Sequence, residues 1–350
     1  MRVLITGGTG FIGQHLARRL RDEHDLVALD VLHPQVHLDP EASRAAFPGE
    51  VVIGDVADPH AWDRVPRCDA IVHLAAETGT AQSMYEQERY VRVNVDGTRL
   101  AGERAAGWGV PVVAASSRAV YGEGRHRTAD GVIGFGARPA GSTPEDSTED
   151  DPHHPVSVYG QTKSDGERAL AEAAATVPVS IVRPQNVIGP GQALHNPYTG
   201  VLAAFLARLR EGKGLIVYGD GTQTRDFVHV HDLAALLHWM LEHPPTPGDP
   251  RILNCGTGVR TDLNALACYA IEGSPRDDVE VEHVDVTRAG DIVDACADLG
   301  RVRACGAPLP EVSSRDAVAG FIQWSWDKPG ADSQAWDAAL GELEARGLTS

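Results

Sequence analysis

The feature that most constrains this chain is a glycine-rich turn near its start. The turn, residues 7–13 (Gly-Gly-Thr-Gly-Phe-Ile-Gly), follows an apolar run at 3–6 and precedes residues 14–20, whose apolar side chains have helical spacing. A turn of this kind lets backbone N–H groups and the positive end of a helix approach a pyrophosphate. Its spacing, Gly-x-x-Gly-x-x-Gly, is a variant of the common dinucleotide fingerprint, although such turns also form for structural reasons alone. The turn predicts a dinucleotide site at Gly7, Gly10, Phe11, Ile12 and Gly13.

A carboxylate ends the second apolar run at the place where a ribose-binding acid is expected. Residues 26–29 are apolar and Asp30 follows them, about 20 residues after the turn. A carboxylate here accepts hydrogen bonds from the adenosine ribose and repels a 2′-phosphate, and residues 31–33 contain no arginine to attract one. The sequence therefore predicts NAD rather than NADP, although a solvated acid at a strand end is common in isolation.

Apolar runs alternate with helical patterns through residue 185. The expected strands are 51–56, 70–76, 110–115 and 179–182, and the expected helices are 84–108 and 157–176. This alternation is typical of an α/β fold in which right-handed crossovers wind a parallel sheet. We therefore expect a Rossmann-type doubly wound parallel sheet. The small residues Ala75 and Ala76 would let a cofactor lie close to the backbone at the end of the 70–76 run.

Two segments depart from this alternation. Residues 125–155 are rich in Gly, Pro, Ser, Thr and acids, and a loop of this length is usually functional or disordered. We interpret it as a flap beside the active site, with a plain surface insertion equally open. Residues 330–350 contain a short amphipathic stretch that either packs as a terminal helix or frays.

Composition excludes several classes of protein. The formal charge of −18 argues against nonspecific binding of nucleic acid or anionic membranes, and no run approaches the ~18 apolar residues of a membrane span. The first strand begins within residues 1–6, which leaves no room for a signal peptide. The five cysteines form no Cys-x-x-Cys pair, and the 15 histidines are dispersed. We therefore expect a cytoplasmic protein with no metal site.

The residues that carry chemistry follow the 110–115 run and begin the 157–176 helix. Tyr159 and Lys163 are four residues apart, so both point from one face of this expected helix. A lysine ammonium about 4 Å from the phenol contributes roughly 4 kcal/mol to the phenolate, enough to bring a pKa of ~10 near 7. Ser117, just after the 110–115 run, could hydrogen-bond the substrate oxygen. A Tyr/Lys pair on a helix is often a surface coincidence, but its position downstream of a dinucleotide turn favours a catalytic role.

Taken together, these motifs resemble the extended short-chain dehydrogenase/reductase superfamily, and within it the nucleotide-sugar epimerases and dehydratases. The resemblance runs from Met1 to about Trp326. Besides the glycine turn, Ser117 and the Tyr159/Lys163 pair, it rests on residues 55–56, 73–76, 94–98, 183–192, 218–227, 254–258 and 288–291. An ordered set of this length is highly specific for the superfamily.

The resemblance implies an organisation and a set of binding residues. It places an NAD-binding part at 1–185, with returns at about 226–254 and 298–326, a nucleotide-sugar-binding lobe at 186–225 and 255–297, and a tail at 327–350. It implies a nucleotide-diphosphate sugar as substrate, tightly bound NAD, and a homodimer formed through helices 84–108 and 157–176. The implied NAD contacts are Asp55, Val56, Leu74, Ala75, Ala76, Asn94, Tyr159 and Lys163, beside the glycine turn and Asp30. The implied substrate contacts are Asn186, Arg225 and Arg288 on the diphosphate, Tyr218 on the base, Asp291 on the ribose, and Thr78.

One departure from the family pattern bears on the reaction. The 4,6-dehydratases of this superfamily carry an Asp-Glu pair where this chain has Arg118-Ala119, and the related decarboxylases keep the Glu. The absence of both acids favours a 4-epimerase, with a 4-keto-sugar reductase or dehydrogenase using exchangeable NAD(P)H as the alternative. A non-enzymatic dinucleotide sensor is disfavoured by Tyr159 and Lys163. Residues 77–83, 117–124 and 196–200 resemble a bacterial subgroup that includes dTDP-L-rhamnose 4-epimerases, so dTDP-L-rhamnose and UDP-hexoses are candidate substrates. At Ala295, where a large aromatic restricts the sugar in UDP-galactose epimerases, alanine predicts a roomier pocket.

Overall fold

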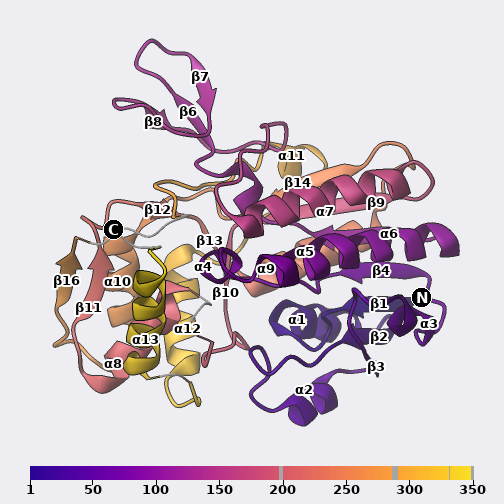
Figure 1. Cartoon of the computed structure of the whole chain (residues 1–350), viewed down its shortest axis with the longest axis horizontal. Coiled ribbons are helices and arrows are strands. Elements are labelled where there is room, and N and C mark those ends of the chain that lie inside the picture. The colour runs from indigo at the N-terminus through magenta and orange to yellow at the C-terminus, as the bar shows by residue number, and fades with distance from the viewer. Residues whose placement is uncertain (197–199, 286–290, 331, 348–350) are drawn as a thin grey trace.

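A seven-stranded parallel sheet forms the centre of the molecule (Figure 1). The computed structural model describes residues 1–196, 200–285, 291–330 and 332–347. The strand order is β14-β9-β5-β4-β1-β2-β3, so the chain begins in the middle of the sheet and winds outward in both directions. This arrangement confirms the predicted Rossmann-type fold. The strands are β1 (Arg2–Thr6), β2 (Asp25–Asp30), β3 (Glu50–Ile53), β4 (Ala70–His73), β5 (Val112–Ala115), β9 (Val179–Pro184) and β14 (Arg251–Cys255).

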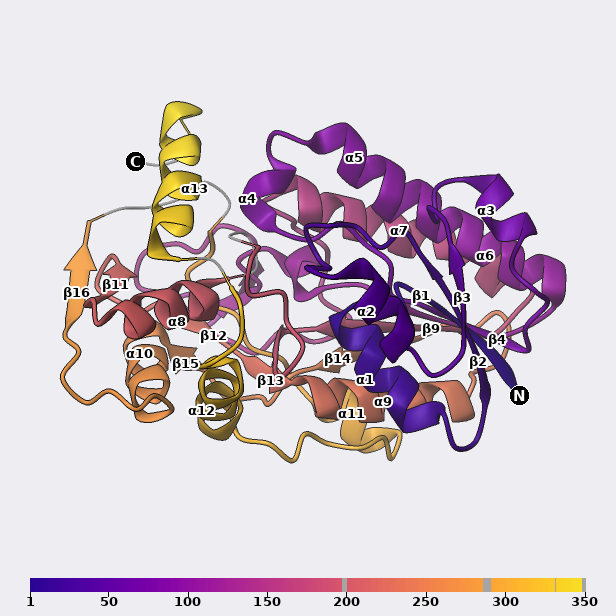
Figure 2. The ribbon, with the colours of Figure 1, turned by 90° about the horizontal axis from the view of Figure 1, so that it is seen from below.

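Helices cover both faces of the sheet because its strands bury side chains on both sides (Figure 2). On one face, Val3 and Ile5 of β1 pack with α1 (Phe11–Leu20), α9 (Val230–Glu242) and α11 (Gly300–Ala304). On the other, Leu4 packs with α3 (Pro59–Asp63), α6 (Gly97–Trp108) and α7 (Val158–Ala174). The short helix α2 (Pro40–Ala46) buries none of its residues.

The helix expected at 84–108 is divided. Its first part is α5 (Gln87–Val91), followed by a π-helical turn η1 (Arg92–Asp96), and α6 completes it. A short helix α4 (Thr80–Ser83) precedes them. Asn94 lies within the π turn, a local geometry that is frequent at functional sites. The predicted long helix is therefore present from residue 87 to 108, three residues shorter at its start, and the π turn within it was missed because periodicity does not distinguish a π turn from the α-helix around it.

Residues 125–155 contain a small antiparallel sheet that extends from the body as an arm (Figure 1). Its strands are β6 (Arg125–Arg127), β7 (Ile133–Phe135) and β8 (Thr143–Pro144), with β6 in the middle. Arg125 and Arg127 of β6 both form ion pairs with Glu145. The sequence suggested an irregular segment, and the strands were missed because each is only two or three residues long.

A second group of elements lies beside the carboxyl-terminal end of the sheet. The helices α8 (Val201–Glu211), α10 (Leu263–Glu272) and α12 (Ser314–Ser325) share a separate core that includes Phe205, Leu266 and Phe321. Residues 314–325 thus pack in this second core, although the sequence grouped 298–326 with the sheet. The strand pairs here are β10 (Asn186–Ile188) with β13 (Phe227–His229), β11 (Leu215–Tyr218) with β16 (Val281–Val284), and β12 (Thr224–Arg225) with β15 (Thr261–Asp262).

The end of the chain contains a helix, α13 (Ser333–Ala345), that contacts α8. At its start, Ser333 accepts a hydrogen bond from Lys213 and donates hydrogen bonds to Glu211, both at the end of α8. No helix within the described ranges is both long and apolar enough to cross a bilayer.

Candidate active site

The glycine turn between β1 and α1 has no room for side chains at two of its positions. Gly7 has φ of +67°, and a Cβ there would lie 2.8 Å from the backbone nitrogen of Ala75. A Cβ on Gly13 would lie 2.4 Å from the carbonyl oxygen of Gly7. The turn therefore brings the end of β4 and the amino terminus of α1 against one backbone cradle. The start of this helix, at Phe11 and Ile12, is a place where backbone N–H groups can meet a pyrophosphate.

Asp30 ends β2 beside this cradle and is buried. Its carboxylate accepts hydrogen bonds from the backbone nitrogen and the hydroxyl of Thr9, at 3.1 and 2.6 Å, and from Leu32 N at 2.9 Å. Burial raises the pKa of Asp30, but hydrogen bonds from His37 and Thr9 outweigh it and hold this pKa below its usual value. The acid is therefore ionised at neutral pH, as a group that repels a 2′-phosphate has to be.

The ends of β3 and β4 supply further cradle residues. Asp55 forms an ion pair with Arg92 of η1 at 2.6 Å, and the neighbouring Val56 is buried. The backbone nitrogens of Leu74 and Ala75 both donate to the Thr6 hydroxyl, at 3.2 Å each. These bonds fix the path of the chain through residues 74–76.

Asn94 connects this path to α7. It is buried, its Oδ1 accepts from Glu77 N at 2.8 Å, and its Nδ2 donates to Thr162 Oγ1 at 3.0 Å. Thr162 lies between Tyr159 and Lys163 in the same stretch of α7, so the amide of Asn94 positions the loop after β4 relative to the catalytic candidates. Thr78, an exposed residue in the same loop, accepts a hydrogen bond at its carbonyl from the Tyr90 hydroxyl.

The three catalytic candidates meet where β5 ends and α7 begins. Ser117 caps the short helix η2 (Arg118–Tyr121), and its hydroxyl lies close enough to the Tyr159 phenol to lower the pKa of that group. Tyr159 is half-buried, its backbone nitrogen donates to Ser83 Oγ at 3.0 Å, and its ring makes an edge contact with Tyr90. Lys163, one turn along α7, is buried and donates from Nζ to Ala115 O at 2.8 Å.

The electrostatics of this trio differ from the expectation. Burial raises the pKa of Tyr159 above its usual value, with the nearby Ser117 hydroxyl and the positive charge of Arg118 acting against it. Burial also lowers the pKa of Lys163 to about 8. The sequence predicted that Lys163 would bring the phenol's pKa towards neutrality. In the structure the Lys163 ammonium is directed at a backbone carbonyl, and the cation acting on the phenol is Arg118.

Arg118 is the site residue whose role the sequence did not predict. In the sequence, Arg118 stands out only as the residue that replaces an acid of the dehydratases. In the structure, its half-buried guanidinium lies near enough to Tyr159, Arg225 and Asp291 to interact electrostatically with all three. Burial, followed by repulsion from Arg225, lowers the pKa of Arg118 to about 10. The sequence signal that could have indicated this role is the position of Arg118 directly after Ser117.

The substrate candidates come from the second group of elements. Arg225, on β12, donates from Nη2 to Ile292 O at 2.8 Å, which places it next to the exposed Asp291. Tyr218 ends β11, and its carbonyl accepts from Gln223 Nε2 at 2.7 Å. Asn186 begins β10, where its backbone nitrogen donates to Asp226 O. Arg225 and Asp291 thus lie near Arg118, whereas Arg288 lies outside the described residues.

Comparison with known proteins gives the family. Residues 3–256 match the model of the NAD dependent epimerase/dehydratase family. The chain is 35% identical to a dTDP-L-rhamnose 4-epimerase of Burkholderia thailandensis, over 96% of this chain and 95% of that protein. It is 30% identical to a UDP-glucose 4-epimerase of Mycolicibacterium smegmatis, over 94% and 99% of the two chains.

Solved structures agree with this family. MoeE5 in complex with UDP-glucose and NAD superposes with a TM-score of 0.74 at 29% identity, covering 93% of this chain and 98% of that one. A UDP-glucose 4-epimerase of Thermus thermophilus in complex with NAD gives 0.78 at 25% identity, over 94% and 100% of the two chains. The cradle without room for a Cβ and the ionised acid at the end of β2 fit the same cofactor. The chain belongs to the NAD-dependent epimerase/dehydratase family and is an enzyme that uses NAD.

Proposed function

We propose that this enzyme is a nucleotide-sugar 4-epimerase that oxidises the C4 hydroxyl transiently and reduces the resulting ketone on its other face. The observation that carries this proposal is the composition of the turn after β5. Ser117 lies beside Tyr159 there, and the next residues are Arg118 and Ala119, so the site offers a proton acceptor but the turn carries no carboxylic acid. Elimination of water needs an acid for the leaving hydroxyl, whereas epimerisation at C4 needs only one reversible proton transfer.

Each residue has a separate task in this scheme. The Tyr159 oxygen takes the proton of the C4 hydroxyl and returns it after the sugar has turned over, while Ser117 holds the same sugar oxygen by a hydrogen bond. Bound NAD supplies the hydride acceptor and donor, so the net redox change is zero. Arg225 holds the nucleotide diphosphate, because an arginine can donate two parallel hydrogen bonds to phosphate, and Asp291 accepts hydrogen bonds from the nucleotide's ribose. Arg118 stabilises the Tyr159 phenolate.

Contacts around the cradle support a resident cofactor. The segment after β2 reaches two distant parts of the chain: Gln35 Nε2 donates to Gln82 Oε1 at 2.8 Å and to Asn196 Oδ1 at 3.2 Å. His195 Nε2 lies 3.0 Å from Pro34 O. A dinucleotide bound between Asp30 and the glycine turn can leave only after these hydrogen bonds break. Slow release of the cofactor suits epimerisation, because that reaction does not consume NAD.

The candidate substrates are dTDP-L-rhamnose and UDP-hexoses. The relative from Burkholderia thailandensis favours the first, and the UDP-glucose 4-epimerases favour the second. Ala295, whose backbone nitrogen donates to Thr224 O next to Arg225, adds little bulk beside the substrate candidates. This small side chain favours tolerance of more than one sugar.

The decisive experiment is NMR of dTDP-L-rhamnose, UDP-glucose and UDP-glucuronate incubated with purified protein and no added cofactor. Formation of a C4 epimer over many turnovers is the expected result and identifies the substrate. If no sugar changes until NADH or NADPH is supplied, and a 4-keto sugar is then reduced, the enzyme is a reductase and the epimerase proposal fails.

A further inference from the structure

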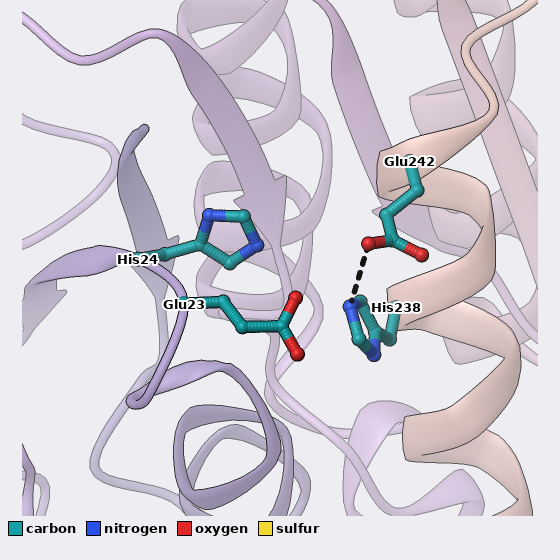
Figure 3. A group of neighbouring side chains, drawn as sticks. All are labelled: Glu23, His24, His238 and Glu242. Atoms are coloured by element: carbon teal, nitrogen blue, oxygen red, sulfur yellow. Dashed lines mark ion pairs between the residues drawn. The ribbon is translucent and has the colours of Figure 1, made fainter.

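We propose that Glu23, His24, His238 and Glu242 form a binding site for a divalent transition metal of the Zn²⁺ type. This site is separate from the proposed epimerase chemistry and does not depend on it. Glu23 and His24 lie near the start of the chain, whereas His238 and Glu242 lie far along it. No short sequence motif therefore contains all four residues. The fold brings them together where the turn after α1 meets the last turn of α9 (Figure 3).

The arrangement of the four side chains matches what such a metal needs. Their ligand atoms, two imidazole nitrogens and two carboxylate oxygens, all lie within 4.8 Å of one another. Figure 3 shows the side chains of the turn and those of α9 directed towards the same space. Zinc sites use nitrogen and oxygen ligands at about 2.0–2.2 Å, which puts neighbouring ligands of a tetrahedron about 3.4 Å apart. Small rotations of the exposed Glu23 and Glu242 close the remaining distance.

Three of the four histidine nitrogens in this cluster lack hydrogen-bond partners within the described structure. Both ring nitrogens of His24 and Nε2 of His238 are buried atoms with no hydrogen bond within the described structure. His238 Nε2 lies 3.2 Å from Glu242 Oε1, one helical turn away, in an ion-pair contact. A buried polar atom without a partner is unfavourable, so these nitrogens are unusual. A metal ion would satisfy one nitrogen on each ring.

One neighbouring cation opposes the metal and gives the proposal a sharp test. Arg19 of α1 donates from Nε to His238 Nδ1 at 3.1 Å. When a metal occupies Nε2, Nδ1 carries the proton and can no longer accept this bond. The exposed Arg19 side chain therefore has to swing into solvent as the metal binds. Replacing Arg19 removes both the competing bond and a positive charge, so it strengthens metal binding.

The location makes the site structural rather than catalytic. His24 precedes β2, whereas Asp30, beside the cofactor cradle, ends the same strand. Six residues of strand span about 20 Å, too far for a metal to contact the cofactor or the sugar. A bound ion instead ties the end of α1 to the end of α9, two helices that pack against each other on one face of the sheet.

The test is Zn²⁺ binding by isothermal titration calorimetry, with the ion alone as ligand and any affinity tag removed, because a polyhistidine tag near Met1 would bind zinc itself. We expect one equivalent of Zn²⁺ and a rise of several degrees in the unfolding temperature at saturating metal. The double variant His24→Ala/His238→Ala should lose at least tenfold in affinity and the temperature rise. Glu242→Gln, a milder change, should weaken binding several-fold.

Two matched variants complete the design. His60→Ala/Asp63→Ala removes another surface His–acid pair, on α3, and should leave zinc binding unchanged. Arg19→Gln should tighten it. Circular dichroism of each metal-free variant shows whether it folds. The proposal is overturned if the wild type binds no zinc, or if binding persists unchanged in the His24→Ala/His238→Ala protein. It is also overturned if Arg19→Gln weakens binding.

Discussion

At the scale of the residue, the proposed chemistry depends on one phenol and the charges around it. Burial keeps the pKa of Tyr159 above its usual value, so the neutral phenol dominates at physiological pH in the cofactor-free protein. Ser117 and Arg118 act in the opposite direction. The sequence suggested Lys163 as the cation that activates Tyr159. In the structure, the Lys163 ammonium instead donates a hydrogen bond to Ala115 O. Two substitutions separate these contributions.

Tyr159→Phe removes the proton acceptor while keeping the ring that contacts Tyr90. General acid–base catalysis contributes about 10²–10⁴-fold, so turnover of the epimerised sugar should fall by at least that factor. NAD released by heating the purified protein should be unchanged in amount. Full activity in this variant would contradict the mechanism.

Arg118→Met removes the positive charge that favours the phenolate and leaves a side chain of similar length. Loss of this charge raises the pKa of Tyr159 further, because the remaining influences are burial, which raises it, and Ser117. The active form is the phenolate, so the rising limb of kcat/KM should move to higher pH, and activity at pH 7 should drop on the order of tenfold. Arg127→Met, on the exposed arm, is the control. A pH profile identical to the wild type would show that Arg118 does not act on Tyr159.

At the scale of the element, the glycine turn holds two strands and a helix close enough to form the cofactor cradle. Gly7 combines a positive φ with a neighbouring backbone nitrogen 2.8 Å from where a Cβ would lie, so no other residue fits there. The same helix α1 then packs on α9 through buried side chains. A change at this turn should therefore affect the cofactor before it affects the rest of the sheet.

Gly7→Ala should lower both the NAD content of the purified protein and its stability. The left-handed conformation alone costs a non-glycine residue about 1–2 kcal/mol, and the Cβ would also push against Ala75. Gly107→Ala is a matched control, because a Cβ added to Gly107 in α6 would meet no atom, and alanine there should stabilise by about 0.5–1 kcal/mol. Cofactor absorbance after heat release and thermal unfolding measure the two effects. Equal NAD content in both variants would refute the role of the turn.

At the scale of the whole molecule, residues 291–297 form a segment that contacts both the arm and the second group of elements. Asp294 pairs with Arg138 of the arm, and its Oδ1 accepts from Thr224 Oγ1 at 2.6 Å. Val293 N donates to Glu123, which lies between η2 and the arm. The segment therefore connects Arg225 and Asp291 with the turn that carries Arg118. The flap interpretation of 125–155 stays a prediction.

Asp294→Asn keeps the shape of this junction but removes its charge. A hydrogen bond to a charged partner contributes about 1.5–3 kcal/mol, so the KM for the nucleotide sugar should rise about tenfold while kcat changes little. The substitution should affect KM rather than kcat, because Asp294 supports residues proposed to hold the nucleotide sugar and does not support Tyr159. Asp130→Asn, at the tip of the arm, should leave both constants unchanged. A fall in kcat with constant KM would place Asp294 in the catalytic step instead.

The sequence alone determined the sheet, its cofactor and the catalytic candidates, because these depend on local patterns. The glycine turn, the acid at position 30 and the four-residue spacing of Tyr159 and Lys163 are each readable within one strand–turn–helix unit. Element boundaries were harder to predict where the chain is locally ambiguous, as in the π turn around Asn94 and the short strands of the arm.

The positions of the charged groups relative to one another depend on how distant elements pack. Lys163 donates to a carbonyl, and Arg118 lies within electrostatic range of Tyr159, because β5, η2 and α7 pack in one particular way. Spacing along a helix does not contain that information. In the same way, 15 histidines dispersed along the sequence gave no metal motif, yet His24 and His238 meet because α1 and α9 pack on the same face of the sheet. Electrostatic interactions act through space, so they follow from the packing of elements that are far apart in the chain.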